Sequence, residues 1–159
     1  MNRKEHVLNA ALLSIGLGYV LHPTGDLTTF YTIVAVGVPV ILGALFPDVD
    51  TAFGKHRKTL HNLPILALFY VFPMEFGNLK FVWIGILTHY ALDMLGSKRG
   101  LALFYPYERE FGVPFGVSVS SSYATIVTLA VTVFELVVAA VIVNGQFLID
   151  SGMTALGLR

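Results

Sequence analysis

The chain has 159 residues, of which 55% are hydrophobic and 13% are charged, and its formal net charge is zero. A soluble domain averages about 25% charged residues, so this deficit of charge predicts an integral membrane protein. The balanced charge argues against direct nucleic-acid binding, and the absence of cysteine excludes disulfides, thiolate metal sites and a cysteine nucleophile. Any bound metal must therefore rest on His, Asp and Glu.

Five apolar segments predict an all-α fold, in which one membrane-embedded domain forms a helical bundle of about five spans: roughly 7–21, 28–46, 63–76, 79–95 and 123–149. The first segment is interpreted as a retained helix, because "HPTGD" follows it instead of a small-residue cleavage site. The segments 7–21 and 63–76 are short for a membrane crossing.

Alternating spans place the N-terminus and the loops 47–62 and 96–122 on one side of the membrane. That side carries eight of the ten basic residues, namely Arg3, Lys4, Lys55, Arg57, Lys58, Lys98, Arg99 and Arg109. Cytoplasmic loops carry the excess of Lys and Arg. The sequence therefore predicts a multi-pass protein of the cytoplasmic (inner) membrane with a cytoplasmic N-terminus.

Ionisable residues gather on this cytoplasmic side. Four of the five histidines and three of the five aspartates fall in one layer, contributed by four helix ends: His6, Asp48, Asp50, His56, His61, His89 and Asp93. In "HYALD", His89 and Asp93 are four residues apart and share a helix face. Taken alone, they fit a hydrogen-bonded pair, and "PDVD" fits a helix stop with an exposed turn. Their convergence predicts a metal site of seven candidate ligands. The predicted ligand core is His6, Asp50, His61, His89 and Asp93, while Asp48 and His56 are either ligands or residues that orient a ligand.

Imidazole and carboxylate donors suit a divalent metal, with Zn²⁺ the first choice and Mn²⁺ or Fe²⁺ as alternatives. Asp48 and Asp50 could serve two ions, or one of them could orient a ligating histidine. In a hydrolase, one of this pair would orient or deprotonate the attacking water. Arg57, next to His56, is predicted to bind a phosphoryl group.

Two further features lie outside this layer. Glu135 falls within the last span, about 18 Å from its cytoplasmic end at 1.5 Å per residue. We expect a structural role for it, with a functional role as the alternative, since carboxylates within a membrane are costly. The aromatic segment "LALFYPYEREFGVPFG" is predicted to lie at the membrane interface, as an anchor or as a lid.

Four motifs resemble a known family, in the same order and spacing: His6, "LGALFPDVD" at 42–50, "HRKTLH" at 56–61 and "GILTHYALDMLG" at 85–96. They are similar to those of the YdjM-type family of inner-membrane-associated, metal-dependent hydrolases, and "FYPYER" at 104–109 echoes a further segment. The resemblance covers about residues 6–110, with Lys58 where the family usually has glycine. A more distant similarity to zinc-dependent phospholipase C implies phosphoester hydrolysis, and the family name carries an association with the LexA repressor as a protein partner.

The sequence thus predicts a membrane-embedded metal-dependent hydrolase of a phosphoester. Its expected substrate is a lipid, a prenyl phosphate or another phosphorylated small molecule at the cytoplasmic face. The protein itself is expected to contact membrane lipid. The alternative is a non-catalytic membrane protein whose structural or regulatory metal site scaffolds a cytoplasmic partner. Ion transport is the weakest alternative, because only His22 and Glu135 offer polar groups towards the far side.

Overall fold

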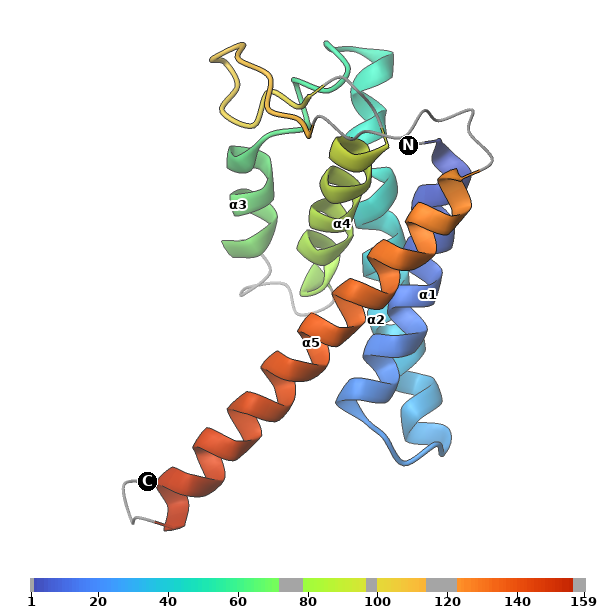
Figure 1. Cartoon of the computed structure of the whole chain (residues 1–159), viewed down its shortest axis with the longest axis vertical. Coiled ribbons are helices and arrows are strands. Elements are labelled where there is room, and N and C mark those ends of the chain that lie inside the picture. Colours follow the sequence, from blue (N-terminus) through green and yellow to red (C-terminus); the bar gives the residue numbers. More distant parts are fainter. Residues whose placement is uncertain (1, 72–78, 97–99, 114–122, 156–159) are drawn as a thin grey trace.

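The computed structural model describes residues 2–71, 79–96, 100–113 and 123–155. Within these residues the chain forms five α-helices and one short 3-10 helix, η1, and no named strand. The helices are α1 (Arg3–Leu21), α2 (Leu27–Leu45), α3 (Leu63–Val71), α4 (Val82–Leu95) and α5 (Ala124–Ala155), with η1 (Pro47–Ala52) directly after α2 (Figure 1). The predicted all-α fold and its five helices are confirmed. Lys98, Arg99 and the end of the predicted segment 63–76 lie outside the described residues.

Side-chain caps set where the helices begin. The Asn2 side chain accepts a hydrogen bond from the backbone N–H of Glu5 at 3.0 Å, and Asp26 accepts from Thr28 and Thr29 at 2.8 and 3.1 Å. The carbonyl of the Asn62 side chain accepts from the backbone N–H of Ile65 at 3.1 Å. The start of α1, the end of α2 and the start of α3 lie at one end of the bundle, which we call the polar end (Figure 1).

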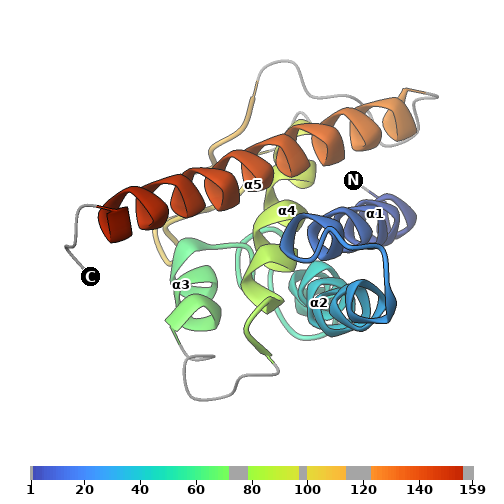
Figure 2. The ribbon, with the colours of Figure 1, turned by 90° about the horizontal axis from the view of Figure 1, so that it is seen from below.

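The helices pack with α2 between α1 and α4, while α5 crosses α1 obliquely (Figures 1 and 2). A buried apolar cluster joins the first two helices, and its members are Ala10, Leu13, Leu17, Val36, Val40 and Ala44. At the crossing of α2 and α4, a Cβ on Gly43 would collide with the Val82 carbonyl, and one on Gly85 with the Val40 carbonyl. These two glycines therefore allow α4 to approach the end of α2 at backbone contact.

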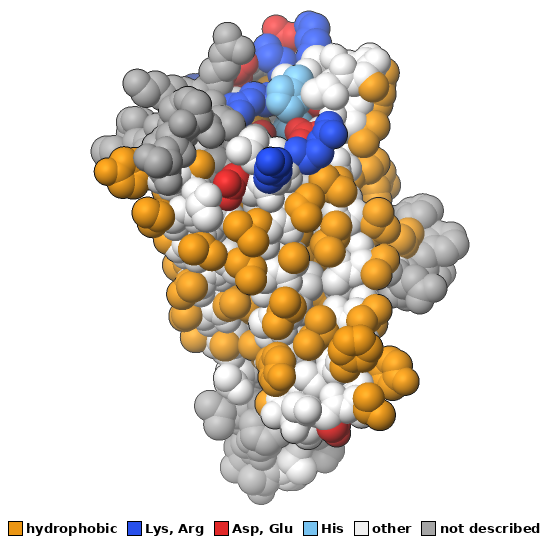
Figure 3. All heavy atoms as spheres, turned by 90° about the vertical axis from the view of Figure 1, so that its right-hand side faces the viewer, with side chains coloured by type: hydrophobic (Ala, Val, Ile, Leu, Met, Phe, Trp, Pro, Cys, Tyr) orange, Lys and Arg blue, Asp and Glu red, His pale blue; other side chains and the backbone are white. Residues whose placement is uncertain are grey.

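The polar end and an apolar band divide the molecular surface. Charged side chains and a histidine gather at one end in Figure 3, and hydrophobic side chains cover the middle of that face. Large apolar residues are exposed along α2 and α5; examples are Val34, Val38, Leu42, Val133, Phe134 and Val137. A band of this kind is typical of a surface in contact with lipid.

Two segments, Leu27–Ala52 and Ala124–Gln146, are long and apolar enough to cross a membrane by length and composition. The helix α4 has 14 residues, or about 21 Å at 1.5 Å per residue, against a hydrocarbon core of about 30 Å. The helix α3 has nine described residues. A bundle of five spans therefore does not follow from the structure, although the five helices do.

A polar network joins α1, α4 and α5 inside the bundle. The Asn9 amide donates to Thr132 Oγ1 and Glu135 Oε2 at 3.0 Å each, which turns its oxygen towards Thr88. Thr88 Oγ1 lies 2.6 Å from that oxygen and 2.5 Å from Glu135 Oε1. Because a hydroxyl has a single hydrogen for two acceptors, the Glu135 carboxyl must supply the second hydrogen. Glu135 is thus a neutral group that ties three helices together.

Candidate metal centre

The structure brings together all seven residues that the sequence predicts as metal ligands. His6 comes from the first turns of α1, and His89 and Asp93 come from α4, while Asp48 and Asp50 lie in η1. His56 and His61 come from the loop between η1 and α3. All of them lie at the polar end.

Five of the seven are buried. The exposed fraction is 1% or less for His6, Asp50, His61, His89 and Asp93. Buried ionisable groups are stable only where hydrogen bonds, ion pairs or a metal compensate the lost hydration. Asp48 and His56 keep 19% and 42% of their side chains exposed, so solvent reaches the cluster on their side.

Hydrogen bonds determine which imidazole nitrogens carry a hydrogen. His89 Nδ1 lies 2.6 Å from the backbone carbonyl of Ala44, and a carbonyl can only accept, so Nδ1–H donates. His61 Nδ1 likewise donates to Asp50 Oδ2 at 2.9 Å. In the neutral rings both Nε2 atoms are therefore bare, and they face one another at 3.1 Å. Two lone pairs this close repel each other unless a cation or a proton lies between them.

Asp93 completes a triangle with these two nitrogens. Its Oδ2 lies 3.6 Å from His61 Nε2 and 3.7 Å from His89 Nε2. Donors bound to zinc at about 2.0–2.1 Å in a tetrahedron stand about 3.3–3.4 Å apart. The three atoms therefore fit three corners of a tetrahedral site, and two histidines with one carboxylate are a donor set of catalytic zinc. Asp48 Oδ1, 3.7 Å from His89 Nε2, offers a further donor.

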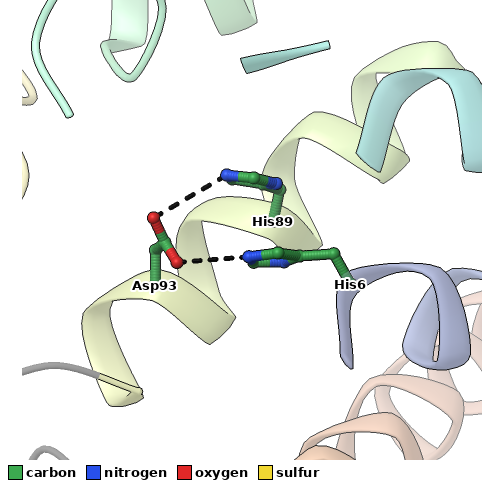
Figure 4. A group of neighbouring side chains, drawn as sticks. All are labelled: His6, His89 and Asp93. Atoms are coloured by element: carbon green, nitrogen blue, oxygen red, sulfur yellow. Dashed lines mark hydrogen bonds and ion pairs between the residues drawn. The ribbon is translucent and has the colours of Figure 1, made fainter. Parts of the chain in front are cut away.

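His6 reaches the same carboxylate from α1 (Figure 4). Its Nε2 lies 3.2 Å from Asp93 Oδ1, and its ring stacks on that of His89 with centroids 3.8 Å apart. His6 Nδ1 is buried and finds no hydrogen-bond partner among the described residues. Two groups of three could each hold an ion, since the ligand atoms within each group lie within 4.8 Å of one another: His6, His89 and Asp93, and Asp48, His56 and His61.

Asp50 contacts two histidines at once. Its Oδ1 lies 3.0 Å from His56 Nδ1, while Oδ2 accepts from His61 Nδ1 and from the Leu60 backbone N–H at 3.3 Å. Both oxygens are therefore engaged by imidazole nitrogens. This arrangement favours the second role considered for the Asp48 and Asp50 pair, in which a carboxylate orients a ligating histidine.

The basic residues of the loop divide into two groups. Lys55 pairs with Glu108 at 3.0 Å, and Lys58 with Glu110 at 3.6 Å, so both contact the aromatic segment. Arg57 has a positive φ of 67°, and its Nη2 lies 3.7 Å from Asp93 Oδ2. Its guanidinium therefore points into the cluster, where it can meet an anionic ligand.

Residues 101–111 of the aromatic segment form a closed loop beside the cluster, and the end of the segment, 114–116, lies outside the described residues. A pair of backbone hydrogen bonds at 2.8 Å joins Leu101 and Phe111, and the Ala102 N–H donates to the Arg57 carbonyl at 3.2 Å. Phe104 and Tyr107 are exposed at 53% and 62%. Exposed aromatic side chains beside a charged layer suit the level of lipid headgroups.

Tyr90 is a site residue that sequence reasoning missed. Its hydroxyl donates to the Leu60 carbonyl at 2.5 Å and accepts from the Asn62 N–H at 3.1 Å. It therefore holds the backbone on both sides of His61. The only signal in the sequence was its place directly after His89, which a buried core tyrosine would share.

Burial also influences the charge of His61. Removal from water lowers the pKa of its imidazole, and the nearby Asp50 carboxylate opposes this change. The net lowering favours the neutral ring at neutral pH, which is the form that binds a metal.

The chain matches the family described as YdjM inner membrane protein over residues 1–153, which confirms the resemblance of the four motifs. Comparisons with curated proteins and with solved structures gave no match, and none of the comparisons shows the more distant similarity to phospholipase C. Because the match covers nearly the whole chain, this protein belongs to the YdjM inner membrane protein family.

Proposed function

We propose that this protein is a membrane-embedded, metal-dependent hydrolase of a phosphoester. The observation that carries the proposal is the triangle of His61 Nε2, His89 Nε2 and Asp93 Oδ2, with sides of 3.1, 3.6 and 3.7 Å. Two bare nitrogens and a carboxylate oxygen at these separations favour a bound cation, because it would satisfy all three atoms, whereas a proton would join only the two nitrogens. Zinc fits this donor set best, and manganese or iron are the alternatives.

The residues of the chain have distinct roles in this proposal. His61, His89 and Asp93 would hold a divalent ion, which would supply a nucleophile from water at neutral pH and polarise a phosphoryl oxygen. Asp48, partly exposed beside His89, accepts the proton of the attacking water. Asp50 keeps His61 in the tautomer with a bare Nε2, and Arg57 binds the anionic phosphoryl group.

We further propose that the polar end faces the cytoplasm and that the substrate is a lipid phosphate or prenyl phosphate. Six of the seven described Lys and Arg residues lie at the polar end, and Lys80 is the exception. In this arrangement α1, α2 and α5 cross the membrane, while α3 and α4 enter from the cytoplasmic side and return to it. A reporter fused to the C-terminus should report a location outside the cytoplasm. A reporter activity that shows the C-terminus in the cytoplasm would contradict this topology.

The deep burial of His61, His89 and Asp93 also suits a second function, a structural or regulatory metal site that supports a cytoplasmic protein partner. The exposure of Asp48 and His56 favours the hydrolase, because catalysis needs access for water.

Metal analysis combined with activity tests the proposal. Protein purified without chelator should contain stoichiometric divalent metal, which His89→Ala should lose. The matched control is His22→Ala, which changes an exposed histidine outside the cluster and should keep the metal. Wild-type protein without metal would contradict the proposal. Bound metal without turnover of phosphatidates, lysophosphatidates or prenyl phosphates would instead support the structural function.

A further inference from the structure

An apolar cavity of about 730 Å³ lies between α4 and α5, with α1 at its base. Fourteen of its sixteen lining residues are apolar, and only Thr88 and Glu135 are polar. The volume falls within the range of about 300–1,000 Å³ that is common for small-molecule sites. The candidate ligands line no part of this cavity, so it is separate from the metal centre.

The cavity follows one face of α4. Trp83, Leu87, Ala91 and Leu95 line it at intervals of four residues, and the twelve steps from Trp83 to Leu95 span about 18 Å at 1.5 Å per residue. One leaflet of the hydrocarbon core is about 15 Å deep, half of about 30 Å. Asp93 lies two residues before Leu95 on the same helix. The cavity therefore extends from the level of the ligand cluster through about one leaflet.

The two polar residues in the wall present no free charge. Thr88 Oγ1 and the Glu135 carboxyl contact each other at 2.5 Å, and both contact the Asn9 amide group. The hydrogen count within this network requires a neutral Glu135. A hydrocarbon chain can therefore lie against this wall without removing a charged group from water.

The α5 side of the cavity borders the surface of the molecule. Phe134, Val138 and Ile142 line it, and their exposed fractions are 69%, 40% and 54%. In an inner membrane protein, such apolar side chains meet lipid. The medium beside the cavity is then hydrocarbon.

We infer that this cavity binds the hydrocarbon chain of a lipid phosphate whose headgroup lies at the metal centre. The inference rests on the proposed function and narrows it. The substrate is a lipid of the leaflet next to the polar end, and its chain extends along α4 from Leu95 towards Trp83. Chain length, in addition to the phosphoryl group, then determines which phosphoesters bind well.

Trp83 makes the inference testable, because it is the single tryptophan of the chain and lines the cavity. The probe is a lysophosphatidate brominated near the end of its chain, titrated into protein in an unbrominated detergent. Tryptophan fluorescence should be quenched saturably, and unbrominated lysophosphatidate should reverse the quenching. Quenching that rises linearly without saturation would refute a defined site.

A matched pair of variants locates the binding. Ala130 lines the cavity on an exposed position of α5, so Ala130→Phe should fill space without disturbing the core. Half-saturation should require about tenfold more lipid, since losing the burial of two methylene groups has about that effect. Ala35→Phe makes the same change on an exposed position of α2 outside the cavity and should leave the titration unchanged. Equal effects of both variants would overturn the assignment.

The outcome can be separated from that of the hydrolase proposal. Saturable quenching that Ala130→Phe weakens, without turnover of any phosphoester, would retain the lipid site and refute the hydrolase. Turnover in which Ala130→Phe raises the KM for long-chain and short-chain substrates equally would retain the hydrolase and refute the lipid site. A higher KM for long-chain substrates alone, with unchanged metal content, would support both.

Discussion

The Asp50→Asn variant tests whether a carboxylate outside the donor triangle of His61, His89 and Asp93 controls the metal affinity of the proposed site. Asp50 Oδ2 accepts from His61 Nδ1 at 2.9 Å and from the Leu60 N–H at 3.3 Å, while Oδ1 lies 3.0 Å from His56 Nδ1. An asparagine supplies one carbonyl oxygen for these contacts and turns an N–H₂ group towards one histidine. The variant therefore keeps the shape of the side chain but loses its charge and one acceptor.

The expected loss follows from this geometry. If the amide oxygen stays with His61 and Leu60, the ring keeps its tautomer but becomes a weaker donor to the metal. Changes to such orienting partners typically lower metal affinity 10- to 100-fold, which is about 1.4–2.7 kcal/mol. Asp93→Asn alters an oxygen of the proposed donor triangle itself, so we expect a larger loss.

A competition titration against a chromophoric zinc chelator measures this affinity. The control is Asp26→Asn, because Asp26 caps α2 from an exposed position and asparagine is an equally good cap. An unchanged affinity in Asp50→Asn would refute the orienting role. A complete loss of metal, equal to that of His89→Ala, would instead make Asp50 a direct ligand.

Three further predictions concern packing, anion binding and the intramembrane network. Gly85→Ala should lower the free energy of unfolding by about 1–3 kcal/mol in denaturant titrations, because the new Cβ collides with the Val40 carbonyl. Gly145 has open space around it, so Gly145→Ala should cause no such loss. Arg57→Ala should lower kcat for a phosphoester about 100-fold with unchanged metal content. Lys55→Ala changes an exposed ion pair and should have little effect on kcat. Equal losses of kcat in the two variants would contradict the role of Arg57. Glu135→Gln should retain most of the thermal stability because the carboxyl is already neutral, and a loss as large as that in Glu135→Ala would show that it is ionised.

Sequence patterns predicted the helices and the set of candidate ligands because both depend on local order. Apolar runs separated by turn residues locate the helices, and alternating direction then brings His6, "PDVD" and "HYALD" to one end. These arguments need only chain direction and helix length. They do not need the rotation of any helix about its axis.

The remaining features depend on that rotation and on packing. The Ala44 carbonyl meets His89 because Gly43 and Gly85 let two backbones touch, and no hydropathy pattern contains that contact. Hydropathy also fails to separate a helix that crosses the membrane from a shorter one packed beside α2, which is why α4 resembled a span. For Tyr90, the hydroxyl's partners lie about thirty residues away in the chain.

The distances along the chain between partners have a consequence for biogenesis. His6 and Asp93 are 87 positions apart, and Asn9 and Glu135 are 126 apart. In the proposed topology, α1 and α2 enter the membrane before either partner has been synthesised, so the first hairpin enters with its imidazole and amide groups unmatched. The donor triangle exists only after α4 has joined α2, and the network at Asn9 only after α5 has followed. If the triangle binds a metal as proposed, the ion can therefore bind only after α4 has been inserted, which is late in the synthesis of the chain.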